Sequence, residues 1–183
     1  MKPPPIKLST DRLLLRAART EDAPPLFQEY TSDIRASRFL PRGPHTSQST
    51  TEAVISKWGE SNWSNSSRFA WTIIERSSDR PIGLFLLFIE GDDQAEIHFG
   101  MCPAAWAHGY ATEAGMAVME WISKQSHLSE VYTTCAASHH TSCRVLEKIG
   151  LRRSRLIPGA LLMKATGEKI DGCQYIWRRS ISQ

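Results

Sequence analysis

The segment CPAAWAHGYATEAGMAV (102–118) decides the fold, because it carries the chain from the end of a strand through a proline-containing turn into a helix. Gly109 lies in this turn, between a histidine and a tyrosine. Beyond it, small and apolar side chains recur with the i, i+3, i+4, i+7 spacing of one helical face, at Ala111, Ala114, Gly115, Val118, Met119 and Ile122. The pattern predicts an amphipathic helix that packs against a sheet.

The residues alone leave two interpretations of Gly109 open. Free backbone N–H groups and the positive end of the helix dipole meet at a helix N-terminus, which suits a phosphate group. A glycine there lets the backbone approach a ligand without a Cβ in the way. In the other interpretation, Gly109 serves only a tight turn.

Three strand patterns precede this segment: RFAWTIIE (68–75), PIGLFLLFIE (81–90) and QAEIHFGM (94–101). The short connections RSSDR and GDD are good turn sequences and predict an antiparallel meander. The middle strand is apolar on both faces, which indicates a sheet covered on both sides.

Similar patterns predict the remaining elements. We expect strands at 13–17, 130–137, 151–157 and 173–181, helices beginning near Asp22, at 50–62 and at 141–150, and an irregular segment at 31–46. The expected order is β-α-α-β-β-β-α-β-α-β-β, a mixed, mostly antiparallel α/β sheet in one domain over residues 1–183.

Composition narrows the class of protein. The chain has 183 residues, 41% of them hydrophobic, and a net charge of +3, which is too mild for a dedicated nucleic-acid binder and leaves room only for a local basic patch. The four cysteines form no CxxC pair or zinc-site spacing, so we expect reduced thiols and no metal. The N-terminus has no signal-peptide pattern, and no apolar run is long enough to span a membrane. We therefore expect a cytoplasmic protein that does not contact membranes.

Three motifs together resemble one family. The segment EIHFGMCPAAWAHGYATEA (96–114) resembles the acetyl-CoA-binding segment of the GNAT superfamily of N-acetyltransferases, and is most similar to its ribosomal-protein acetyltransferase-like (RimJ/RimL) branch. LSTDRLLLRAARTEDA (8–23) and SHHTSCRVLEKIGL (138–151) are similar to the motifs that open and close that pattern. The resemblance covers about residues 8 to 180 and implies a GNAT fold whose sheet is splayed between the fourth and fifth strands.

The resemblance also implies where acetyl-CoA binds. The pyrophosphate is expected on the loop that opens the helix, and the pantetheine arm along the strand that precedes it. The residues implied in binding are Phe99, Gly100, Met101, Trp106, Ala107, His108, Gly109, Tyr110, Ala111, Thr112, His139 and Ser142. His139 stands where the branch has an asparagine that contacts pantetheine, and Ala107 replaces a glycine.

Acetyl transfer to an amine requires removal of a proton and stabilisation of an oxyanion. Glu96 is the expected general base, and His98, which shares its face of the strand by alternation, is the second candidate, with water as a third route. An N–H group near Phe99 to Met101 serves the oxyanion. Ser142 either hydrogen-bonds the CoA sulfur or caps the helix at 143–149.

The acceptor is the least determined part of this prediction. The segments 31–50 and 156–172 are expected to frame its pocket, and their charges favour a primary amine on a peptide or protein N-terminus, or a small amino-acid-like amine, over a polycation. The alternative is a protein of the same fold without catalysis, which senses acyl-CoA or contacts RNA through Arg152, Arg153 and Arg155. That RRSR run is expected to be a solvated edge, and nucleic acid is not the expected partner. The sequence does not distinguish a monomer from a homodimer.

Overall fold

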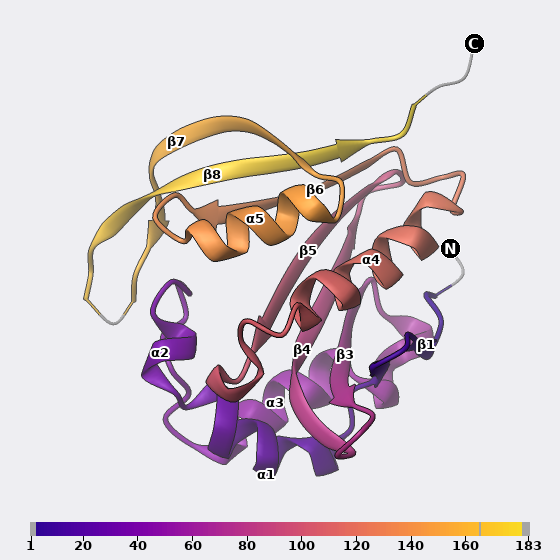
Figure 1. Cartoon of the computed structure of the whole chain (residues 1–183), viewed down its shortest axis with the longest axis vertical. Helices are drawn as coiled ribbons and strands as arrows, with labels where there is room; N and C mark the ends of the chain where they lie inside the picture. The colour runs from indigo at the N-terminus through magenta and orange to yellow at the C-terminus, as the bar shows by residue number, and fades with distance from the viewer. Residues whose placement is uncertain (1–2, 165, 181–183) are drawn as a thin grey trace.

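In the computed structural model, which describes residues 3–164 and 166–180, the strands form one eight-stranded sheet in the order β1-β2-β3-β4-β5-β6-β8-β7 (Figure 1). All neighbouring strands are antiparallel except β5 and β6, which are parallel. The strands are β1 (Lys7–Ser9), β2 (Leu13–Ala17), β3 (Arg68–Glu75), β4 (Arg80–Glu90), β5 (Gln94–Met101), β6 (Glu130–Ala136), β7 (Arg152–Leu162) and β8 (Lys169–Arg178).

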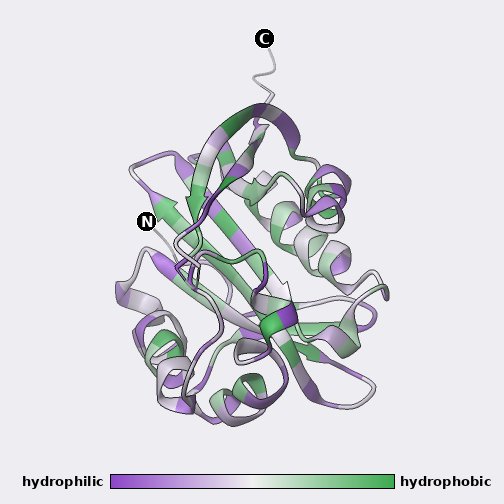
Figure 2. Ribbon diagram, turned by 90° about the vertical axis from the view of Figure 1, so that its left-hand side faces the viewer, coloured by the Kyte–Doolittle hydropathy of each residue, from purple (hydrophilic) through white to green (hydrophobic). Residues whose placement is uncertain are grey.

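Helices cover both faces of this sheet (Figure 2). They are α1 (Ala23–Leu26), α2 (Ile34–Ser37), α3 (Gln48–Trp58), α4 (Tyr110–Ser123) and α5 (His140–Lys148). A π-helical turn (Phe27–Thr31) extends α1, and 3-10 turns lie at Thr20–Asp22, Glu60–Asn65 and Pro103–Ala105. The α/β class and the GNAT-type order of the main elements are confirmed.

The sheet opens between β5 and β6. The two strands pair only over Gln94–Glu96 and Glu130–Tyr132, although β5 continues to Met101 and β6 to Ala136. Figure 1 shows them meeting at one end and diverging toward the other. The expected splay between the fourth and fifth of the predicted strands is therefore present, and it leaves one edge of β5 without a strand partner.

The central strands owe their position to burial on both faces. Phe85 and Leu87 of β4 are fully buried on one face, and Leu84 and Phe88 are 6% exposed on the other. Such a strand needs a covering layer on each side. On one face α1 contacts β4 and Trp58 of α3 packs on Phe88, and α4 crosses the other face (Figure 1). Asp22 fastens the start of α1 to the sheet, because its buried carboxylate accepts hydrogen bonds from Arg16 and Thr72.

The structure corrects the expected elements near both ends of the chain. It adds the short strand β1, and it places α2 inside the segment expected to be irregular. The helix expected at 50–62 is α3, which ends at Trp58, because Gly59 is extended and the chain continues as a 3-10 turn. Only glycine fits there, since a Cβ would lie 2.2 Å from the Ala18 carbonyl oxygen.

The last two strands are longer than expected, and their connection is shorter. β7 runs through Pro158 and Gly159 to Leu162, so only residues 163–168 connect it to β8. The pairing register shifts between Ile157 and Leu161, and this bulge accommodates the proline and the glycine, whose φ is 61°. β7 is an edge strand, where a missing N–H costs little. β8 ends at Arg178, and Ile181, the expected strand end, lies outside the described residues.

Candidate active site

The loop before α4 presents a run of unpaired backbone donors. The N–H groups of residues 107–112 donate to no other residue in the described part of the chain, and the first bonded amide is that of Glu113, to the Gly109 carbonyl at 3.0 Å. Ala107 and Gly109 are left-handed, with φ of 63° and 79°. Alternation of left-handed residues turns successive N–H groups to one side, which forms an anion-binding concavity at the helix N-terminus.

Gly109 fits both interpretations derived from the sequence. Its φ of 79° is one that side chains other than glycine rarely adopt, so the turn requires it. A Cβ at this position would meet only the Arg12 guanidinium, at 3.7 Å, so the space above the loop is otherwise open. The turn conformation and access for a ligand therefore coincide at this residue.

Arg12 holds the loop from the side. Its guanidinium donates to the His108 carbonyl at 3.0 Å and to the Glu113 carboxylate at 2.7 Å, and Thr10 also donates to Glu113 at 2.5 Å. These hydrogen bonds and the salt bridge to Arg12 lower the pKa of Glu113 despite its partial burial, which by itself acts in the opposite direction. The turn between β1 and β2 thus fixes the start of α4.

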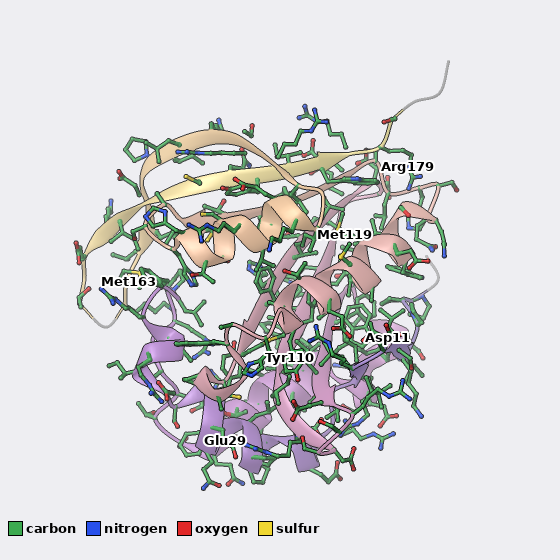
Figure 3. The ribbon with its side chains drawn as sticks, in the orientation of Figure 1. Asp11, Glu29, Tyr110, Met119, Met163 and Arg179 are labelled. Atoms are coloured by element: carbon green, nitrogen blue, oxygen red, sulfur yellow. The ribbon has the colours of Figure 1, made fainter. Side chains whose placement is uncertain are left out.

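The side chains of the loop fold back onto the protein. The Trp106 indole donates to the Met101 carbonyl at 3.0 Å, and the His108 ring contacts the Trp106 carbonyl at 2.7 Å through Nδ1. Tyr110, at the start of α4 (Figure 3), donates its hydroxyl to Glu75 at 2.6 Å, and this hydrogen bond raises its pKa. These contacts hold the Trp106, His108 and Tyr110 side chains beside the loop, although Trp106 and His108 stay exposed.

The β5 strand carries the expected catalytic pair. The Glu96 carboxylate and His98 Nε2 lie 3.3 Å apart, as the alternation of the strand predicted. The His98 ring also packs on Phe88, with centroids 5.3 Å apart, and Tyr132 lies across the sheet from Glu96 and donates to Glu90 at 2.5 Å. The hydrogen bond that Tyr132 donates to Glu90, followed by burial, raises the pKa of Tyr132, so this hydroxyl stays protonated.

Nearer the open end of the splay, β5 carries a residue that tolerates no side chain. A Cβ at Gly100 would lie 2.1 Å from the Tyr30 hydroxyl, which comes from the π-helical turn. Tyr30 is 6% exposed, and burial raises its pKa. Gly100 therefore lets the first helical layer approach the edge of β5 closely.

The β6 side of the splay uses side chains. His139, the residue before α5, stacks on Phe39 with ring centroids 4.3 Å apart and planes at 19°. Burial and the neighbouring His140 lower the pKa of His139, so its ring is neutral. Ser142 lies in the first turn of α5, which begins at His140, so its expected role as cap of a helix at 143–149 is wrong.

Three cysteine thiols lie near Ser142, on β6, α5 and β8. Cys135 and Cys143 bring their Sγ atoms to 4.0 Å, and burial raises the pKa of Cys135 to about 12 although Ser142 hydrogen-bonds to it. Cys173 lies opposite Cys135 in the β6–β8 pair. All four cysteines are free thiols, as expected from their spacing.

Sequence reasoning assigned no role to several residues that shape this region: Arg12, Tyr30, Phe39, Glu75, Glu90 and Tyr132. Arg12 lies inside the first quoted motif, so its position carried a signal. Phe39 and Tyr30 reach the splay from segments far away in the sequence, and no local pattern marks them.

Two absences bear on the class of site. In residues 3–164 and 166–180, no three or more His, Cys, Asp or Glu side chains gather in a way that could hold a metal ion. Across the same described ranges, no helix is both long and apolar enough to cross a bilayer.

Comparison with known proteins assigns the family. The model of the acetyltransferase (GNAT) domain matches residues 12–152. The chain is 31% identical over 147 residues to YnaD of Bacillus subtilis (strain 168), an uncharacterized N-acetyltransferase, covering 80% of this chain and 82% of that one.

Solved structures share the fold. A GNAT-family acetyltransferase from Bacillus anthracis aligns with a TM-score of 0.81 at 24% identity, covering 94% of this chain and 98% of the other. RimL, a ribosomal L7/L12 alpha-N-protein acetyltransferase solved with coenzyme A, aligns with a TM-score of 0.79 at 15% identity over the same shares.

The chain belongs to the GNAT family of acetyltransferases, and its enzymatic class is acetyl transfer from acetyl-CoA.

Proposed function

We propose that this protein transfers the acetyl group of acetyl-CoA to a primary amine on a peptide or protein N-terminus or on a small amino-acid-like molecule. The observation that carries the proposal is the run of unpaired amides at residues 107–112, beside the open edge of β5. Six converging N–H donors at a helix N-terminus match the charge and the acceptor oxygens of a pyrophosphate. His108 and Arg12 add basic groups at the rim.

The pantetheine arm is assigned to the unpaired edge of β5. Beyond Glu96 this strand has no partner on the β6 side, so the main chain of Phe99 to Met101 offers hydrogen bonds to an extended amide chain, as an added strand would. The Met101 carbonyl already accepts from Trp106, which leaves the groups before it for the ligand. Ser142 comes from α5 and His139 from the turn before it, and we assign Ser142 as the donor to the CoA sulfur.

The proton of the attacking amine is assigned to Glu96 and His98. Their 3.3 Å separation lets one side chain orient the other, and both are partly exposed on the face of β5 that carries Gly100.

Substitution of Glu96 by Gln should lower kcat about 100-fold, the lower end of the usual contribution of general bases. Glu90→Gln is the matched control, because Glu90 is also a carboxylate in this group but bonds Tyr132. Equal losses in both variants would contradict the assignment and favour water.

The segments proposed to border the acceptor pocket are shorter than the residues 31–50 and 156–172 expected from the sequence. The β7–β8 connection contributes only residues 163–168, and it joins the α2 segment through a hydrogen bond from the Lys164 amide to the Pro41 carbonyl at 3.1 Å. Arg35 pairs with Asp33, whereas Arg38 forms no ion pair with a described residue. A rim whose Arg38 guanidinium has no carboxylate partner suits one amine with a neutral or anionic remainder and disfavours a polycation.

Calorimetry with CoA tests the binding site. Gly109→Val should weaken binding at least 10-fold, because valine disfavours a φ of 79° and the loop must rearrange. Gly91→Val is the matched control: Gly91 is also left-handed, with φ of 62°, but lies in the β4–β5 turn with open space around it. Equal CoA affinity in Gly109→Val and the wild type would overturn the assignment.

Turnover tests the acceptor class. N-terminal peptides, free amino acids and polyamines should be compared at the same acetyl-CoA concentration by thiol release. We expect turnover with peptides or amino acids. The fastest turnover with polyamines would show that the charge argument is wrong, and no turnover with any amine would contradict the proposed acceptor class as a whole.

A further inference from the structure

A cavity lies at the start of β7 and the end of β8. Its volume is about 520 Å³, and its walls include Gly150, Arg152, Arg153, Ser154, Trp177 and Arg178. In Figure 3, Arg179 and Met163 mark opposite ends of the β7–β8 ribbon, and the cavity lies at the Arg179 end. The rim proposed for the acceptor lies at the Met163 end, next to α2.

Register places the cavity away from the proposed CoA groove as well. Trp177 lies opposite Val131 in the β6–β8 pair, and Val131 lies opposite Ala95 where β5 and β6 are still paired. His139 and Ser142 belong to the other end of β6, where the two strands have separated. The cavity is therefore a separate feature of the molecule.

Positive charge is concentrated around this cavity. Residues 144–155 carry five cations (Arg144, Lys148, Arg152, Arg153 and Arg155) and one carboxylate, Glu147. This segment alone has a net charge of +4, whereas the whole chain has +3, so the rest of the chain is net −1. The net charge of the whole chain is mild, but its positive charge is concentrated in this one segment.

Two of these arginines have no charged partner. Arg152 and Arg153 are exposed and form no ion pair or side-chain hydrogen bond with another residue of the described ranges, whereas Arg178 pairs with Glu130 at 2.8 Å and Arg155 bonds Gln174 at 3.0 Å. A guanidinium offers a planar fork of donors that matches the oxygens of a phosphate. Because successive residues of a strand point to opposite faces, Arg152 and Arg153 present these groups on the two sides of the edge strand β7, beside the cavity that both residues line. Two unpaired guanidinium groups at this edge favour phosphate ligands.

The wall of the cavity is fixed before any ligand arrives. Arg179 donates to the carbonyls of Ser123 at 2.8 Å and Gln125 at 2.7 Å, at the C-terminal end of α4, and its guanidinium lies 5.6 Å from the centre of the Trp177 ring. Tyr175 bonds Glu147 of α5 at 3.3 Å. These contacts hold β8 against both helices, so little order must be gained on binding.

We propose that this cavity, with the basic edge of β7, binds the phosphate groups of a single-stranded RNA. Arg155 follows on β7, and the exposed Arg144 and Lys148 lie on α5, which leads directly into the cavity residue Gly150. This spread of cations favours a chain of phosphates over one anion. Trp177 in the wall offers an aromatic surface for a base. The RRSR run is an exposed stretch of an edge strand, as expected, and the proposal adds a ligand to that edge.

The test is fluorescence anisotropy with a labelled 12-nucleotide single-stranded RNA between 50 and 200 mM KCl. The double variant Arg152→Gln/Arg153→Gln should bind at least 10-fold more weakly at 50 mM. Loss of two phosphate contacts should also reduce the slope of log K against log salt by about 1.4. CoA affinity and thermal melting of the variant should match the wild type, which separates this result from the proposed acetyl-transfer site.

Lys7→Gln/Lys57→Gln is the matched control, because it removes two exposed cations, one of them on β1 at the opposite edge of the sheet. It should bind the RNA as the wild type does. The proposal is overturned if the wild type does not bind RNA, if the control loses as much affinity as the arginine variant, or if polyglutamate competes as well as RNA. Complete competition by free AMP at equal phosphate concentration would assign the cavity to a nucleotide instead.

Discussion

The two sides of the splay are built by different means. On the β5–α4 side, backbone amides and left-handed residues form the proposed phosphate loop, and the side chains of Trp106, His108 and Tyr110 fold back onto the protein. On the β6–α5 side, side chains from distant segments meet, as in the stack of Phe39 on His139. A site made of backbone should tolerate changes of side chain except at its glycines, whereas a site made of side chains should be specific and more easily altered.

The largest effect is expected on the backbone side, for Gly100→Val. Its Cβ would lie 2.1 Å from the Tyr30 hydroxyl, so the strand edge or the π-helical turn must shift. We expect unfolding free energy to fall by about 1–3 kcal/mol and acetyl transfer to fall at least 100-fold. Chemical denaturation and turnover measure the two effects. Adding Tyr30→Phe should recover part of both losses, and no recovery would show that the close contact is not the cause.

A smaller effect is expected for Arg12→Gln, which releases the His108 carbonyl and the Glu113 carboxylate. The loop amides should then lose their fixed direction, and CoA affinity should fall about 5-fold, or ~1 kcal/mol. Arg76→Gln is the matched control, because Arg76 bonds the Thr10 carbonyl nearby and carries the same charge. Equal weakening in both variants would mean that bulk charge, and not the geometry of the loop, governs binding.

On the side-chain side, Phe39→Ala should affect the acceptor more than CoA. Removing the stack on His139 should cost about 1 kcal/mol locally, as for other aromatic pairs. We expect the KM for the acceptor to rise about 5-fold while CoA affinity changes less than 2-fold in calorimetry. A larger change in CoA affinity than in acceptor KM would reverse the proposed division between the two sides.

The smallest effect is a pH dependence at His45, in the segment between α2 and α3. Burial, followed by the charge of Arg42, lowers the pKa of His45 from 6.5 to about 4, and its ring contacts Thr51 at 2.8 Å. Because the folded pKa is lowered, the stabilisation is complete above pH 6.5 and is lost as the pH falls to about 4. The ring is only half-buried, so we expect about 1 kcal/mol at most. Melting of the wild type and of His45→Gln between pH 7 and 4 measures it, and identical profiles would contradict it.

The sequence by itself determined the parts that depend on local periodicity and on glycine. The stripe from Ala111 to Ile122 predicted α4, the three patterned segments predicted the meander, and Gly109 marked the turn that needs a left-handed residue. Alternation along β5 was enough to place Glu96 and His98 on one face. These features are readable because each depends on neighbours within a few residues.

Only the tertiary structure decided the contacts between distant segments. Phe39 lies 100 positions before His139, and Arg12 lies 96 positions before His108, so no local pattern relates them. The bulge that carries β7 through Pro158 and Gly159 depends on pairing with β8, and it moved the acceptor rim to residues 163–168. Arg152, Arg153 and Trp177 line one cavity only because the start of β7 pairs with the end of β8. These contacts join residues that are distant in the sequence and come together only when the chain folds. A local sequence pattern therefore could not specify these sites.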